Sequence, residues 1–229
     1  MLGQAFADSL NQHALRRQLI QHPFFDHVRS AELSKEQVAM FLGQWWHPLH
    51  YFPDFLSRLI AATPRIEIRT AISKILFQEL GEGDVKRAHE VIYLDTMVPL
   101  GFTEAEVSGA APFEATRALV AAYAEQAKEM FSGLGFLYGT EVADLAMVSG
   151  IGSAVRRVTG AKHLEWVEIH VQQEPEHVAR ANDAVGLDFP AAEEKAILQG
   201  AETMWKHWIA FFDELDRRIF AQASAALHS

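Results

Sequence analysis

Two histidines and one glutamate near residue 170 have the spacing of a metal site on a single helix. His170, Glu174 and His177 stand at positions i, i+4 and i+7, so on an α-helix they lie within roughly 60° of one face. Trp166 precedes them by one turn on the same side, which is unusual for a solvated stripe. Pro175 is expected to distort this helix, as often happens around a functional site. The alternative interpretation is a solvated polar face with a chance ion pair.

A glutamate and a histidine on either side of a glycine-rich break form a second candidate. Glu79 precedes glycines at positions 81 and 83, and His89 follows them. On one unbroken helix the two side chains would be about 15 Å apart along the axis, too far to share a metal ion. Because the glycines interrupt the helix, the two side chains can converge. The alternative is an ordinary helix end followed by a solvated acidic loop.

The third candidate is a carboxylate in one of the most apolar segments of the chain. Glu141 lies within residues 134–158, where a buried carboxylate is costly unless it is paired or bound to a metal. Asp144 lies one turn further on and could share the role of metal ligand, or simply mark the polar side of the helix. Glu141 could alternatively lie at the edge of an amphipathic helix.

Together the three candidates supply carboxylates and imidazoles, while the chain contains no cysteine. Oxygen and nitrogen ligands without thiolates suit iron or manganese, and helical bundles build dinuclear sites of this kind from facing helices. A ferritin-type site needs two Glu-x-x-His motifs, whereas we find one, at positions 174–177. The absence of cysteine also excludes disulfides, iron–sulfur clusters and thiol nucleophiles.

Length and composition limit the remaining possibilities. The 229 residues indicate one domain over residues 1–229, since no linker, low-complexity tract or repeat divides them. A formal net charge of −10 argues against nucleic acid as a partner, because nucleic-acid binding depends on cationic contacts. No basic N-terminal stretch precedes an apolar run, and no run of about 18 apolar residues is present. We therefore expect a soluble, cytoplasmic protein with no membrane partner.

Helices must position the candidate residues, because Ala, Leu, Glu, Gln and Arg dominate the long segments and hairpin signals are missing. The sequence thus predicts an all-α fold. Ser34 with Gln37 predicts a capping box, and Pro48 and Pro53 are expected to kink or interrupt the helix that follows. Thr63 is expected to cap the next helix. Two of the expected helices begin near residue 23 and near residue 84. The other expected helices span approximately 6–21, 34–47, 63–80, 103–106, 113–132, 134–158, 163–185 and 190–225.

In their order these elements resemble the haem-oxygenase-like di-iron oxidases and oxygenases, relatives of the TenA-type and pyrroloquinoline-quinone synthase proteins. Members of that family carry a Glu, a His several residues later, a Glu on a central helix, and then His-x-x-x-Asp/Glu-x-x-His. The resemblance covers nearly the whole chain. It implies a seven-helix haem-oxygenase-like bundle with two Fe(II) ions, or an iron–manganese pair. The metal ligands it implies, which form the catalytic centre, are Glu79, His89, Glu141, His170, Glu174 and His177.

Two features refine what the resemblance implies. Glu82 suits the variable Glu-to-His interval of the family as well as Glu79 does, but Glu79 precedes the glycine break and can point into the bundle. We therefore prefer Glu79. Family members that make p-aminobenzoate from their own side chains carry a Tyr directly before the central Glu and a Lys further along that helix. Here Thr140 takes the first position and no lysine follows until Lys162, so we expect no self-sacrificing reaction.

The candidate substrate wall lies at the two prolines near residue 50, where aromatic and imidazole rings crowd. His47 and His50 could orient a substrate carboxylate, or could be core histidines without a function. Core packing is an equally good explanation for Trp46 and Phe52. The residues expected to contact the substrate are Trp45, His47, His50, Tyr51 and Trp166.

The resemblance implies an O2-dependent non-haem di-iron oxidoreductase of specialised metabolite biosynthesis. We expect N-oxygenation or oxidative C–C cleavage of a small amino-acid-derived substrate, with O2 as co-substrate, an external electron donor and a homodimeric assembly. One alternative is oxidative decarboxylation of a fatty acid on the same fold, which needs a long apolar pocket. The other is a metal-free TenA-like helical binding protein, and metal content separates it from both enzymes.

Overall fold

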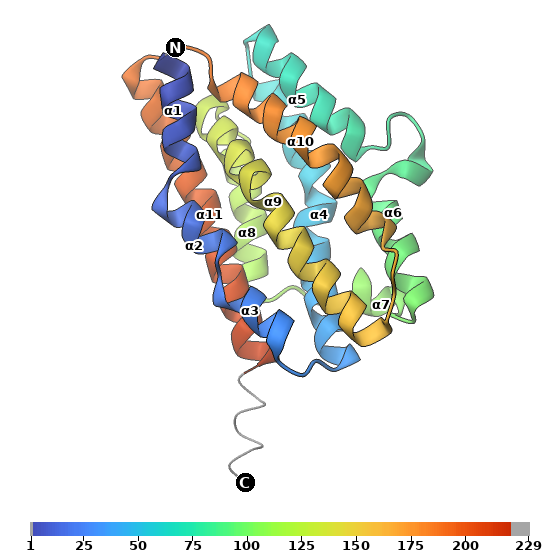
Figure 1. Ribbon diagram of the computed structural model, residues 1–229. Coiled ribbons are helices and arrows are strands. Elements are labelled where there is room, and N and C mark those ends of the chain that lie inside the picture. The colour runs from blue at the N-terminus through green and yellow to red at the C-terminus, as the bar shows by residue number, and fades with distance from the viewer. Residues whose placement is uncertain (1, 221–229) are drawn as a thin grey trace.

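The computed structural model describes the backbone of residues 2–220 and the side chains of residues 5–220 other than Glu174. Within this range the chain is helical and has no strand, which confirms the all-α class (Figure 1). Two short 3-10 turns, η1 (Val85–Arg87) and η2 (Val98–Leu100), flank α6. The α-helices are α1 (Leu2–Asn11), α2 (Ala14–Ile20), α3 (Pro23–Ser30), α4 (Lys35–Ala62), α5 (Ile66–Glu79), α6 (His89–Met97), α7 (Glu104–Val107), α8 (Glu114–Gln126), α9 (Met130–Thr159), α10 (Glu165–Val185) and α11 (Ala191–Ile219). The expected count of seven is not confirmed, because short helices at the turns are separate elements.

Helix α9 lies at the centre of the bundle, with α10 and α11 on either side of it in Figure 1 and α4 and α8 also packed against it. Small residues let α11 approach closely: a Cβ on Gly135 would lie 1.8 Å from the carbonyl oxygen of Ile197. By length and composition α9 could cross a membrane, but 78% of its most apolar window is buried inside the protein. Helix α9 is therefore the core helix around which the others pack.

Helix α4 runs unbroken through Pro48 and Pro53, so the expected interruption near residue 47 is wrong. Each proline removes one backbone donor and strains the preceding turn, at a cost of about 3 kcal/mol. Burial of the apolar face of α4, which includes Leu49 and Phe55, offsets that cost. Because the helix is continuous, residues three or four apart between Trp45 and Phe52 lie on the same face of α4.

Local signals set several helix ends. The capping box is confirmed, since the Gln37 N–H donates to Ser34 Oγ at 3.2 Å and the Ser34 N–H donates to Gln37 Oε1 at 2.8 Å. The expected cap at Thr63 is wrong, because its hydroxyl donates to the Leu59 carbonyl at 2.7 Å and α5 begins later, after Arg65. The expected helix over 6–21 is two helices, α1 and α2. The last helix, α11, spans Ala191–Ile219 with Phe220 as its C-cap, and the expected helix end near residue 225 lies outside the described residues.

The glycine-rich break between α5 and α6 is a compact turn. Gly81, Glu82 and Gly83 all have positive φ, at 79°, 57° and 92°. A Cβ on Gly81 would lie 2.2 Å from the carbonyl oxygen of Asp84, so this position requires glycine. Asp84 then caps η1 by accepting the Lys86 N–H at 3.0 Å. The turn brings the last residue of α5 close to the first residue of α6.

Candidate metal centre

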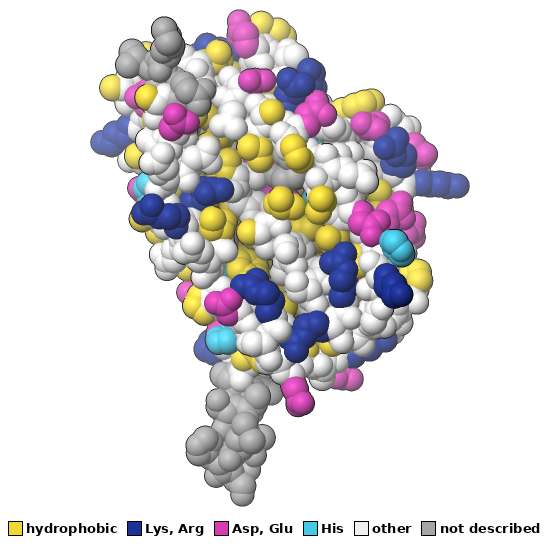
Figure 2. Space-filling model, in the orientation of Figure 1, with side chains coloured by type: hydrophobic (Ala, Val, Ile, Leu, Met, Phe, Trp, Pro, Cys, Tyr) yellow, Lys and Arg dark blue, Asp and Glu magenta, His cyan; other side chains and the backbone are white. Residues whose placement is uncertain are grey.

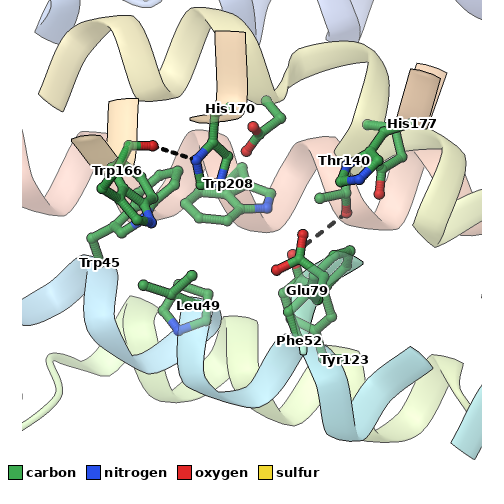
Figure 3. A pocket seen from close by; sticks show the side chains of 13 residues that line it. Trp45, Leu49, Phe52, Glu79, Tyr123, Thr140, Trp166, His170, His177 and Trp208 are labelled. Carbon is green, nitrogen blue, oxygen red and sulfur yellow. Dashed lines mark hydrogen bonds and ion pairs between the residues drawn. The ribbon is translucent and has the colours of Figure 1, made fainter. Parts of the chain in front are cut away.

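Five of the six predicted ligands meet inside the bundle, between α5, α6, α9 and α10. The side chain of the sixth, Glu174, lies outside the described set. The five are at most 6% exposed, although all are polar. Figure 3 shows Glu79, His170 and His177 around one cavity. They come from the C-terminus of α5, the N-terminus of α6, the middle of α9 and one face of α10, and are Glu79, His89, Glu141, His170 and His177.

One carboxylate–imidazole pair joins α5 to α6. Glu79 Oε2 lies 3.0 Å from His89 Nδ1, although the angle does not satisfy a hydrogen bond and this nitrogen has no hydrogen-bond partner among the described residues. The His89 ring lies close to those of His170 and His177, with centroid distances of 4.7 and 6.5 Å. The glycine break thus brings Glu79 and His89 together, and α10 places the imidazoles of His170 and His177 beside them.

A second pair joins α9 to α10. Glu141 Oε2 lies 3.4 Å from His177 Nδ1. Glu141 Oε1 is buried and accepts no hydrogen bond from the described part of the chain. A buried carboxylate oxygen without a donor is destabilising unless a cation binds it. Asp144, the alternative ligand one turn along α9, lines the same cavity.

The three imidazoles share one hydrogen-bonding pattern: each donates one ring N–H to an outer oxygen acceptor. The acceptors fix the ring orientation and leave the second nitrogen for a ligand, as partners of metal-bound histidines usually do. For His89 and His177 that second nitrogen is Nδ1, which faces a buried carboxylate. The outward bonds are His170 Nδ1 to the Trp166 carbonyl at 2.7 Å, His89 Nε2 to Gln173 Oε1 at 2.9 Å, and His177 Nε2 to Gln78 Oε1 at 3.0 Å.

Burial and charge shift these groups in different directions. Burial alone would raise the pKa of Glu79, but the His89 imidazole outweighs it and lowers that pKa to about 2. Burial lowers the pKa of His170 to about 3, and the charge of His89 adds to this effect. For His177, burial is outweighed by the Glu141 carboxylate, which raises the pKa to about 9. The carboxylate of Glu79 also raises the pKa of His89 against the effect of burial. Without metal, the protonated imidazoles of His89 and His177 therefore balance the buried carboxylates, while His170 stays neutral.

The donor set fits iron, but the described side chains do not enclose an ion as they stand. Among them, no three His, Asp or Glu residues converge tightly enough to hold one metal ion. The pairing of Glu79 with His89 and of Glu141 with His177 explains this, because each carboxylate turns toward an imidazole. The uncompensated oxygen of Glu141 and the inward nitrogens nevertheless provide the hard and borderline ligands that iron prefers.

The cavity beside the cluster is small and mostly apolar. Its volume is about 40 Å³, enough for a few water molecules. Tyr123 donates or accepts a hydrogen bond with Thr140 at 3.4 Å, and burial raises the pKa of this tyrosine well above its ordinary value. The walls comprise Trp45, Pro48, Leu49, Phe52, Glu79, Tyr123, Thr140, Glu141, Asp144, Trp166, His170, His177 and Trp208.

The structure brings part of the predicted substrate wall to this cavity. Trp45 and Trp166 line it, with their rings 6.1 Å apart. His47 instead donates to the Ala110 carbonyl at 2.9 Å, and the exposed His50 pairs with Glu90. Tyr51 is also outside the cavity lining. The continuous phase of α4 explains the difference, since positions 45, 48, 49 and 52 share one face.

Other positions were harder to foresee. Glu82, the alternative to Glu79, points away from the cluster and pairs with Arg87 at 3.0 Å. Leu49 follows Trp45 by one turn, so helical spacing could have identified it. Tyr123 on α8 and Trp208 on α11 carry no motif that links them to the cluster, and only the packing of their helices places them there.

Comparison with known sequences gives the family context. The family model for an iron-containing redox enzyme matches residues 39–209. The 4-aminobenzoate synthase of Chlamydia muridarum is 25% identical over 139 residues, and the 4-chloro-allylglycine synthase of Streptantibioticus cattleyicolor is 24% identical over 139 residues. These matches cover 59% and 60% of this chain but only 57% and 53% of the relatives, so the chain spans about half the length of each. The 4-aminobenzoate synthase of Chlamydia trachomatis is 24% identical over 85% of this chain and 79% of its own.

Solved structures share the fold at low sequence identity. A CADD-like protein of unknown function from Nostoc punctiforme superposes with a TM-score of 0.80, at 15% identity, over 97% of both chains. A TenA homologue from Pseudomonas syringae superposes with a TM-score of 0.75, at 14% identity, over 93% of both chains. These likenesses show a haem-oxygenase-like helical fold of the TenA type.

Proposed function

The chain belongs to the family of iron-containing redox enzymes, and from that premise we propose that it is an O2-dependent non-haem di-iron oxidase or oxygenase. One observation carries the proposal. Three buried imidazoles donate their outer N–H groups to protein oxygens and turn their other nitrogens toward a buried region with two carboxylates. A metal-free binding protein gains nothing from burying so many ionisable groups together, because their desolvation is costly.

Different residues of the chain would bind the metal, orient its ligands and exclude water. Glu79, His89, Glu141, His170 and His177 would hold the iron, and Glu174 would complete the set. The glutamines at 78 and 173 and the Trp166 carbonyl keep the imidazoles oriented. The indoles at 45, 166 and 208 limit the access of water to the cavity. Bound iron would supply electron transfer and O2 chemistry, with electrons from an external donor.

We further propose that the substrate is a small compound derived from an amino acid. The named relatives support this class, because one is described as a 4-chloro-allylglycine synthase and others as 4-aminobenzoate synthases. N-oxygenation and oxidative C–C cleavage both suit such a substrate. In this chain Thr140 precedes Glu141, where the self-modifying members carry a tyrosine, so the substrate is expected to be a separate molecule.

Iron binding tests this proposal. The chain is loaded with ferrous iron without oxygen, desalted and assayed for metal, and we expect about two ions per chain. His170→Ala and His177→Ala should each weaken iron binding by about tenfold or more and slow O2 consumption, because each removes a ligand. His163→Ala, whose side chain is 90% exposed, is the matched control and should bind iron like the parent. The proposal fails if both ligand variants bind as much iron as the parent.

A further inference from the structure

A groove on the outer face of the bundle is much larger than the inner cavity. It lies between α2, α9 and α10, and its volume is about 580 Å³. Figure 2 shows hydrophobic side chains gathered on this face, with basic side chains at its α2 edge. Typical small-molecule sites occupy about 300–1,000 Å³, so a compact ligand fits here but not in the inner cavity. We call it the Arg16 groove, lined by Asn11, Arg16, Ile20, Glu141, Val142, Ala143, Leu145, Ala146, Ser149, Pro175 and Val178.

The half-buried guanidinium of Arg16 is the groove's cation. Its Nε donates to the Val142 carbonyl at 2.9 Å, and its Nη1 donates to the Asn11 carbonyl at 3.2 Å. These two bonds fix the side chain and leave other N–H groups of the fork for a ligand. Among the described side chains, no carboxylate lies within ion-pair distance of Arg16, whose two hydrogen bonds go to backbone carbonyls. A fixed, partly desolvated cation without an acid suits an anionic ligand.

The groove also reaches the candidate metal centre. Glu141 lines both the groove and the inner cavity, so a ligand in the groove lies against this buried carboxylate. Arg16 is anchored at Val142, the next residue of α9. The remaining wall is largely apolar, and Leu145, which is 44% exposed, contributes to it. The groove thus combines a carboxylate-binding fork, an apolar wall and proximity to the site of chemistry.

We propose that the Arg16 groove binds the carboxylate of an amino acid with an apolar side chain, with the guanidinium of Arg16 as the anchor. The ligand's carboxylate accepts from the free N–H groups of the fork, and its side chain lies on the apolar wall beside Leu145. Asn11, which lines the groove next to Arg16, offers an amide oxygen to the α-ammonium group. This inference rests on the proposed function only in assigning the bound amino acid as the substrate.

Binding can be measured without turnover. Calorimetric titration without oxygen compares L-norleucine, pentylamine (which lacks the carboxylate) and hexanoate (which lacks the ammonium group), on both the iron-loaded and the metal-free chain. We expect norleucine to bind more tightly than either analogue. Arg16→Gln should weaken norleucine binding by about tenfold, the value of one charge-assisted hydrogen-bonded contact. Arg17→Gln, at an exposed position of the same helix, is the matched control and should match the parent.

Two further variants keep the test decisive if Arg16→Gln folds poorly. Arg16→Lys retains the charge without the fork and should bind norleucine with intermediate affinity. Leu145→Trp leaves Arg16 in place but fills the groove, so it should also reduce norleucine affinity. Circular dichroism verifies that each variant is folded.

The outcomes separate this inference from the proposed function. Unchanged norleucine affinity in both Arg16→Gln and Leu145→Trp would overturn the Arg16 groove as the binding site, while iron binding would still support the oxidase. Tighter binding of hexanoate than of norleucine would overturn the amino-acid assignment. If the chain bound norleucine through Arg16 but held no iron, the groove would stand and the proposed oxidase would fail.

Discussion

At the scale of residues, the candidate centre depends on which groups face each buried side chain. Three imidazoles are each fixed by one outward hydrogen bond, and two of them meet a carboxylate with the other nitrogen. Spacing in the sequence selected these residues, but it did not indicate Gln78 or Gln173 as the acceptors. Those acceptors decide which ring nitrogen is available to a ligand.

The pair of glutamates before His89 gives a direct test at this scale. Glu79 is 5% exposed and 3.0 Å from His89 Nδ1, whereas Glu82 is bound to Arg87 on the outside. We expect Glu79→Ala to weaken iron binding by about tenfold or more, because a ligand is lost. Glu82→Ala, the control, should stay close to the parent. Anaerobic iron titration with chelator competition measures both, and the reverse order would make Glu82 the ligand.

His47 gives a pH-dependent prediction away from the metal centre. Burial lowers the pKa of His47 despite its hydrogen bond to the Ala110 carbonyl. The unfolded chain, with a histidine pKa near 6.5, then binds more protons than the folded chain as the pH falls below that value, so acid destabilises the fold. We expect His47→Gln to lose less stability than the parent from about pH 7 to about pH 5.5.

Urea unfolding of the chelator-treated protein at the two pH values measures this difference. Ser57→Ala, an exposed and non-titrating change on the same helix, is the control and should lose as much stability as the parent. Equal losses in His47→Gln and the parent would show that the neutral form of His47 contributes nothing to the pH dependence.

At the scale of elements, the turn between α5 and α6 decides whether the first pair of ligands can meet. Both flanking glycines have positive φ, but only Gly81 is enclosed, since a Cβ there would lie 2.2 Å from the Asp84 carbonyl. A Cβ on Gly83 would meet nothing within 4 Å. The turn thus requires a positive φ at both Gly81 and Gly83, and at Gly81 it also leaves no room for a side chain.

Alanine substitutions in this turn test that distinction. Gly83→Ala should cost roughly 1 kcal/mol from its backbone conformation alone. Gly81→Ala should cost about 1–3 kcal/mol more, because the turn must also open to relieve the clash. Opening of the turn in Gly81→Ala should separate Glu79 from His89 and so weaken iron binding. Gly83→Ala should leave iron binding unchanged. Urea midpoints and iron titration measure both effects, and equal behaviour of the two variants would contradict this account.

At the scale of the whole molecule, the cluster joins four helices through buried polar groups. α5, α6, α9 and α10 each contribute a residue, so an ion bound between them links segments far apart in the chain. A metal that binds the folded but not the unfolded chain must stabilise the fold. The apolar core, to which α9 and α11 contribute many side chains, is formed by residues that are not metal ligands.

Removal of iron should therefore lower the thermal stability without unfolding the protein. At a free iron concentration about a hundred times the dissociation constant, we expect the midpoint to rise by roughly 5–10 °C over the chelated protein. His177→Ala should lose most of this increase, whereas His163→Ala should retain it. Differential scanning calorimetry with and without chelator measures the shift, and an identical midpoint in both conditions would exclude a metal that bridges the four helices.

The sequence alone determined the features that depend on local interactions and on residue type. Helical propensity and the missing hairpin signals predicted the all-α class, and the capping box at Ser34 marked the start of α4 correctly. The glycine break next to Glu79 predicted that this carboxylate could approach His89, because backbone conformation at glycine is a local property. Periodicity along α10 likewise placed His170 and His177 on one face.

Only the tertiary structure decided which surfaces meet. α4 continues through Pro48 and Pro53, since packing outweighs the local cost, and its phase then turns His47 and His50 away from the cavity. Tyr123 and Trp208 reach the cavity because α8 and α11 pack beside α4 and α9, and Arg16 and Glu141 line one groove between helices. Such contacts depend on the sum of many packing interactions between distant segments, which no local pattern in the sequence contains.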